Sequence, residues 1–117
     1  MSNQETVLQQ NIRLALGQHS NLRLFRNETG KLPDPRTGRW VQFGLAKGSS
    51  DLIGFKTIKI TPDMVGKEIA QFVSLEIKTE RSKLSTLQHN WLQKVKSSGG
   101  IVGVARTVED ALQLLKS

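Results

Sequence analysis

The chain has 117 residues, and its 17 lysines and arginines outweigh 10 acidic residues to give a formal net charge of +7. This length suits a single domain over residues 1–117 and leaves little room for a second one. The positive charge favours a polyanionic partner, most often nucleic acid and sometimes an anionic membrane, although a basic surface that only faces solvent is an alternative. The absence of cysteine excludes disulfides and thiolate metal sites.

The sequence contains no apolar run approaching the ~18 residues of a membrane span. The opening stretch MSNQETVLQQ lacks the pattern of a signal peptide. We therefore expect no membrane segment and a cytoplasmic location.

The first half of the chain predicts a helix, a short strand and a long connection. Apolar residues recur at helical spacing over residues 5–16, and one carboxylate falls on the same stripe. The members of this stripe are Glu5, Leu8, Ile12, Ala15 and Leu16. LRLFR (22–26) predicts a strand. The glycine- and proline-rich residues 27–50 are too long for a plain loop and predict a hairpin excursion or a functional loop.

The second half predicts two strands, a helix, a third strand and a final helix. Ser85 and Gln88 have the spacing of a capping box, which opens the first of these helices. The predicted ranges are a strand over 51–60, a turn or edge insertion over 61–68, a strand over 69–79, a helix over 85–96, a strand over 101–105 and a helix capped at 107–110. The order α-β-β-β-α-β-α indicates an α/β fold with helices packed on a mixed sheet.

Several polar residues occupy positions where a purely structural pattern would place apolar ones. Glu76 and Lys78 are two apart in a predicted strand, so their side chains emerge on the same face. Burying an unpaired carboxylate costs several kcal/mol, and one lysine cannot neutralise three. A divalent cation such as Mg²⁺ can, because it prefers oxygen ligands. The candidate residues are Glu5, Asp51, Glu76, Lys78 and Gln88.

Each candidate also has a structural interpretation. Glu76 and Lys78 can form an exposed pair worth less than ~1 kcal/mol. Asp51 can cap a turn, and Glu5 can complement the dipole of its helix. Gln88 can simply complete the capping box, although a site role is compatible with that function.

The order of these residues resembles the core motif of the PD-(D/E)xK nuclease superfamily, an Asp on one strand and a Glu-x-Lys on the next. The sequence is more closely similar to the VRR-NUC family, which adds a helical Glu near its start. The segments that carry this resemblance are Glu5, KGSSDLIGF, SLEIKTERSKLSTLQHNWL and GGIVGVARTVEDAL. One departure is Ser50, where the superfamily often has a proline before the Asp.

The resemblance implies a restriction-endonuclease-like core with a central mixed β-sheet. It further implies a Mg²⁺- or Mn²⁺-dependent phosphodiesterase that acts on DNA. Asp51, Glu76 and the Ile77 carbonyl would hold the metal, and Glu5 would support it directly or through water. Lys78 would position the attacking water, and Gln88 would orient Lys78 or the nucleophile.

The remaining cations suit contact with a phosphate backbone. The candidates for that contact are Arg23, Arg26, Arg36, Arg39, Lys47 and Arg81. Trp40 and Phe43 can stack on an unpaired base or anchor the loop to a core. A family domain without added recognition domains resembles Holliday junction resolvases, so we expect a homodimer that prefers branched DNA. Its interface is expected on the last helix or around residues 58–70.

Three other functions remain compatible with the residues. One is a non-catalytic nucleic-acid-binding module on a nuclease fold. The second is a nicking nuclease without junction preference. The third is a metal-dependent RNase or nucleotide hydrolase. The intact set of Glu5, Asp51, Glu76 and Lys78 argues against the binding module, which gains nothing from clustered acids facing DNA.

Overall fold

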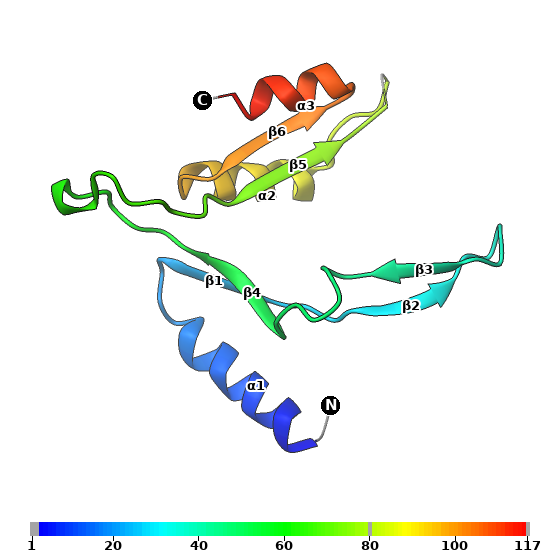
Figure 1. The fold of residues 1–117 in the computed structure, drawn as a ribbon, viewed down its shortest axis with the longest axis horizontal. Coiled ribbons are helices and arrows are strands. Elements are labelled where there is room, and N and C mark those ends of the chain that lie inside the picture. The colour runs from blue at the N-terminus through cyan, green and yellow to red at the C-terminus, as the bar shows by residue number, and fades with distance from the viewer. Residues whose placement is uncertain (1–2, 80, 117) are drawn as a thin grey trace. The chain divides into compact units, whose positions relative to one another are not determined.

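The structure is a computed structural model that describes residues 3–79 and 81–116. These residues form three α-helices and six short strands (Figure 1). In chain order the elements are α1 (Asn3–Leu16), β1 (Leu22–Arg26), β2 (Gly30–Pro33), β3 (Trp40–Phe43), β4 (Leu52–Lys56), a 3₁₀ turn η1 (Pro62–Met64), β5 (Val73–Ile77), α2 (Thr86–Ser97), β6 (Ile101–Ala105) and α3 (Val108–Leu114). The chain divides into two units, Met1–Lys56 and Thr57–Ser117, each with its own strand pairs.

The strands pair in three two-stranded sheets, whereas the sequence predicts one central mixed sheet. The β1–β4 and β2–β3 pairs are antiparallel and the β5–β6 pair is parallel, so both pairing types of a mixed sheet are present. The β2–β3 hairpin adds two strands to the predicted order. It confirms the hairpin alternative for residues 27–50.

In the first unit, β1 and β4 pair along five residues, and α1 contacts β1. The rings of Phe25 and Phe55 lie 6.4 Å apart between centroids and join the two strands. The buried face of α1 differs from the predicted stripe. Gln9 is its buried residue, while Leu8 and Ile12 are 59% and 38% exposed. A two-stranded sheet is too narrow to cover the whole apolar stripe of a helix within this unit.

In the second unit, α2 connects the parallel strands β5 and β6. Ser85 caps α2 through the predicted capping box. The helix ends before Gly99, whose φ of 97° is the left-handed conformation that glycine adopts most easily. The predicted strands at 51–60 and 69–79 are shorter in the structure. Each strand extends over the five residues that face a partner strand, because unpaired backbone gains nothing from a strand conformation.

The two helices of this unit cover opposite faces of the β5–β6 pair. Trp91 of α2 donates from Nε1 to Ser74 Oγ at 2.8 Å, so the even-numbered side chains of β5 face α2. Gly103, which pairs with Leu75, faces α3, because a β-carbon there would lie 2.5 Å from Leu114 Cδ1. Figure 1 shows both helices beside the strand pair. Glu76 therefore belongs to the face that α2 covers.

The core of the second unit is small. Val95 is 1% exposed, Ala105 2% and Leu92 7%. None of the helices within residues 3–79 and 81–116 is long and apolar enough to span a bilayer.

Candidate active site

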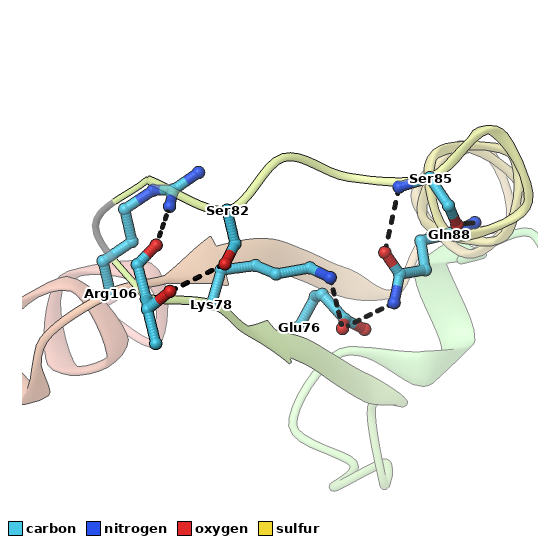
Figure 2. A network of polar contacts seen from close by, with 7 residues as sticks. Glu76, Lys78, Ser82, Ser85, Gln88 and Arg106 are labelled. Carbon is cyan, nitrogen blue, oxygen red and sulfur yellow. Dashed lines mark hydrogen bonds and ion pairs between the residues drawn. The ribbon is translucent and has the colours of Figure 1, made fainter.

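Three polar side chains of the second unit meet on the face of β5 that α2 covers. Gln88 donates from Nε2 to Glu76 Oε1 at 2.9 Å, and Lys78 Nζ lies 3.8 Å from the same oxygen. Figure 2 shows the amide and the ammonium converging on this carboxylate from the helix and from the strand end. The structure therefore brings together three of the five candidate residues.

Gln88 uses both ends of its amide. Its Oε1 accepts from the Ser85 backbone N–H at 3.0 Å, while its own backbone N–H donates to Ser85 Oγ at 3.1 Å. Because the oxygen is required at the helix cap, the NH₂ group must point to Glu76. The capping contacts and the contact with Glu76 are therefore made at the same time. That Gln88 orients Lys78 or the nucleophile stays a prediction.

The pair of Glu76 and Lys78 is partly buried. Their side chains are 30% and 19% exposed, so solvent screens the attraction less than in a fully exposed pair. Both contacts fall on Oε1 of Glu76. Among the described residues, Oε2 receives no hydrogen bond or ion pair, and it remains available to a further donor or cation.

The segment after β5 is fixed by Arg106, which the sequence did not single out. Its guanidinium donates to the Thr79 carbonyl, and its backbone N–H donates to Asp110 Oδ2 at 2.9 Å. Lys78 N–H donates to the Ala105 carbonyl at 3.2 Å, one hydrogen bond beyond the strand pair. Arg106 and this bond set the direction of the backbone from which the Lys78 side chain starts. An arginine directly after a buried strand carries no spacing signal that would have identified it.

Asp51 lies in the first unit, directly before β4, and its side chain is exposed. Its turn is held by Asn27, the second residue that the sequence did not single out. Asn27 Nδ2 donates to Ser49 Oγ at 2.7 Å and to the Ser50 carbonyl at 2.9 Å. Its Oδ1 accepts from Leu45 N–H at 3.2 Å. Its backbone N–H donates to the Asp51 carbonyl at 2.8 Å.

Through these four hydrogen bonds, Asn27 holds the turn that precedes β4 and carries Asp51. The partners of its side chain lie 18 to 23 residues away in sequence. No local pattern links an asparagine to a turn at that separation.

Glu5 lies in the first turn of α1 and is exposed, a position that also suits interaction with the helix dipole. Glu5 and Asp51 belong to the first unit, while the Glu76 cluster belongs to the second. Among the predicted phosphate contacts, Arg26 forms an ion pair with Glu28, and Arg36 Nε lies 3.8 Å from Asp34 Oδ1. All the residues predicted to contact phosphate are exposed. They are Arg23, Arg26, Arg36, Arg39, Lys47 and Arg81.

Within residues 3–79 and 81–116, no three histidine or carboxylate side chains gather closely enough to hold a metal ion. The donors that are present suit a hard cation. Glu76 offers an unengaged carboxylate oxygen, and Asp51 offers an exposed carboxylate. Such oxygens are the ligands that Mg²⁺ and Mn²⁺ prefer in proteins.

A glutamate and a lysine two apart on one strand face, with an amide from the next helix, indicate the class of PD-(D/E)xK nucleases. A family model described as the VRR-NUC domain matches residues 3–109, nearly the whole chain. The chain therefore belongs to the VRR-NUC family, which is a family of PD-(D/E)xK nucleases, and the resemblance seen in the sequence is confirmed. No curated protein and no solved structure matches the chain. Membership implies a nuclease with a DNA substrate.

Proposed function

We propose that the chain is a divalent-metal-dependent DNA endonuclease that hydrolyses phosphodiester bonds, with a preference for branched DNA. The observation that carries this proposal is the convergence of Lys78 and Gln88 on one oxygen of Glu76, in a chain of a nuclease family. A carboxylate held in this way has one oxygen oriented by protein groups and the other directed to a further partner.

Glu76 and Asp51 hold the metal in this proposal, together with the Ile77 carbonyl, and Glu5 supports them directly or through water. A bound Mg²⁺ or Mn²⁺ polarises the phosphodiester and lowers the pKa of a coordinated water. Ile77 follows Glu76 in β5, so its carbonyl is one residue away along the strand. The proposal places β1–β4 and β5–β6 in one restriction-endonuclease-like sheet, an arrangement that rests on the family.

Lys78 positions the attacking water and stabilises negative charge as it develops on the phosphate. The ammonium is held near Glu76 at 3.8 Å, which keeps it on the strand face that carries the carboxylate. Gln88 acts through Glu76. By donating to Oε1 it limits rotation of the carboxylate and directs Oε2 outward.

The preference for branched DNA is supported by the size of the chain. A compact domain of 117 residues has a radius of gyration near ~13 Å, so it spans about one turn of duplex. A two-fold pair would present two sites to two strands through a self-complementary interface. Val108 and Leu112 of α3, which are 75% and 57% exposed, are candidates for that interface. Sedimentation at micromolar concentration tests the dimer.

The decisive experiment is a cleavage assay on labelled duplex, flap, splayed and four-way DNA, with Mg²⁺ and with EDTA. The proposal expects cleavage with Mg²⁺ only, faster on branched than on plain duplex DNA. The double variant Asp51→Asn/Glu76→Gln is the matched control, because it removes two charges and few atoms. Cleavage by this variant at the wild-type rate would show that the activity does not come from this site. Equal cleavage of duplex and branched DNA would leave a nicking nuclease without junction preference.

A further inference from the structure

The β2–β3 hairpin has two different faces. In its register Lys31 pairs with Gln42 and Pro33 with Trp40, so these four side chains share one face. The other face carries Leu32, Val41 and Phe43. The ring of Phe43 lies over Gly30, where a β-carbon would be 2.5 Å from Phe43 Cζ. Phe43 therefore packs on the backbone of the hairpin itself.

Trp40 does not anchor the hairpin to a core. Trp40 is 70% exposed, against 40% for Phe43 and 39% for Trp91. A two-stranded hairpin on its own is only marginally stable, and an exposed indole adds no stability to it. An exposed indole beside a cation on one strand face is instead a typical surface for stacking on a base.

The tip of the hairpin is ordered by hydrogen bonds within residues 34–39. Asp34 N–H donates to the Arg39 carbonyl at 2.7 Å, and Gly38 N–H donates to the Asp34 carbonyl at 2.8 Å. Asp34 Oδ1 accepts from the backbone of Arg36 at 2.8 Å. Gly38 has a φ of 71°, which lets the chain reverse at this point.

The ordered backbone of this tip carries two exposed cations. The side chain of Arg36 is 90% exposed, and Arg39 is exposed beside Trp40. The acid of the hairpin, Asp34, is 21% exposed and is engaged inside the turn. The charge that the hairpin offers to a partner is therefore positive, and it lies next to an aromatic ring.

We propose that this hairpin binds a single-stranded segment of the DNA substrate. In this arrangement Arg36, Arg39 and Lys31 contact phosphates, and the indole of Trp40 stacks on an unpaired base. The proposal rests on the proposed nuclease function and names the feature of branched DNA that the chain recognises. A polyanion without bases can pair with the arginines but offers nothing that stacks on Trp40. Stacking on Trp40 therefore distinguishes nucleic acid from other anionic partners.

The first test measures DNA binding by fluorescence anisotropy in EDTA, where metal-dependent cleavage does not occur. The probes are a duplex of about 20 base pairs, blunt or with a single-stranded tail of about 10 nucleotides. Trp40→Leu is expected to weaken binding of the tailed DNA by about 5- to 150-fold, as for the loss of one base–aromatic stack. Binding of the blunt duplex should change little. Trp40→Phe, which keeps a ring, should restore most of the loss.

The second test separates the arginines from general charge. Arg36→Ala/Arg39→Ala should weaken binding of the tailed DNA more than binding of the blunt duplex. For the tailed DNA it should reduce the slope of log K against log salt by about 1.4, the value for two single-strand phosphate contacts. Lys94→Ala/Lys96→Ala, on exposed positions of α2, removes the same charge and should keep the wild-type slope. Equal slopes in the two double variants would overturn the assignment of the tip.

The third test uses Trp40 as a fluorophore in a Trp91→Phe background, where it is the remaining tryptophan. Stacking predicts quenching by a single-stranded oligonucleotide and no quenching by heparin, a polyanion without bases. Equal effects of both ligands, or equal losses of Trp40→Leu on tailed and blunt DNA, would overturn the proposal. These readouts need no cleavage. If the wild-type chain cuts no DNA but Trp40→Leu still weakens binding of the tailed DNA, the nuclease proposal fails and the hairpin proposal stands. If the wild-type chain cuts DNA but Trp40→Leu binds the tailed DNA normally, the hairpin proposal fails and the nuclease proposal stands.

Discussion

The two units position their candidate carboxylates in different ways. Glu76 is held at the side-chain level, because Gln88 and Lys78 both contact its Oε1. Asp51 is held at the backbone level, because Asn27 bonds the Ser49–Asp51 turn while the Asp51 side chain stays exposed. The first arrangement fixes the direction of a carboxylate. The second fixes only the place from which a carboxylate starts.

The contrast indicates which residues control each half of the proposed site. Around Glu76, substitutions of neighbouring side chains should alter the chemistry while leaving the backbone in place. Around Asp51, the important neighbour is Asn27, which acts through the backbone of the turn. The following predictions test that contrast.

Glu76→Gln and Asp51→Asn should each have the largest effect, a loss of turnover by roughly 1,000-fold, because each removes a charge proposed to hold the metal. Both variants keep the size of the side chain, so circular dichroism should show an unchanged fold. Cleavage assays under single-turnover conditions check the loss. A mild effect of Asp51→Asn beside a severe effect of Glu76→Gln would remove Asp51 from the site.

Lys78→Met should reduce turnover by about 100-fold while leaving DNA affinity nearly unchanged, because its role concerns the attacking water and the developing charge. Methionine keeps the length of the apolar stem. Anisotropy in EDTA and single-turnover cleavage separate the two quantities. If affinity and rate fall together, Lys78 is an ordinary phosphate contact.

Asn27→Ala should lower turnover by about 10- to 100-fold, in the range seen when residues that orient metal ligands are removed. It should also lower the free energy of unfolding by about 0.5–1.5 kcal/mol, because the hydrogen bonds that tie the turn are lost while water can replace them at the exposed partners. Ser49→Ala is the matched control, since it removes one of the three side-chain bonds of Asn27. Wild-type turnover of Asn27→Ala at a temperature where the chain is folded would mean that Asn27 only stabilises the loop.

Gln88→Glu and Ser85→Ala should separate the two functions of the capping box. Gln88→Glu keeps an acceptor for the Ser85 N–H but loses the donor to Glu76, so turnover should fall about 10-fold. Ser85→Ala removes the Oγ cap and should cost about 0.5–2 kcal/mol of stability with turnover unchanged. Thermal unfolding and cleavage rates measured on both variants check this. Equal behaviour of the two variants would show that the amide contact with Glu76 has no role of its own.

The sequence predicts local features of this fold well. Ser85 and Thr107 cap their helices and residues 101–105 form a strand, as predicted. Helix caps and short buried strands can be predicted because they depend on neighbouring residues. Periodicity also places Gln88 and Glu76 on inward faces, whereas the hydrogen bond between them was not predicted. The joint action of Glu76 with Asp51 and Glu5 stays a prediction.

The features that the sequence did not predict depend on long-range contacts, which no local sequence pattern records. The side chain of Asn27 and the guanidinium of Arg106 reach partners 18 to 27 residues away. The extents of β4 and β5 are set by the length of their partner strands. The buried face of α1 likewise depends on how much of the helix β1 covers.

The two-ended amide of Gln88 makes the start of α2 and the state of Glu76 energetically dependent on each other. Thermodynamic linkage is reciprocal, so whatever draws Glu76 Oε1 away from the amide also loosens the first turn of the helix. The same amide receives the Ser85 backbone N–H. Hydrogen exchange at Ser85, measured by NMR before any bond in DNA is cut, therefore reports whether a bound cation leaves Glu76 Oε1 with the amide or draws it away.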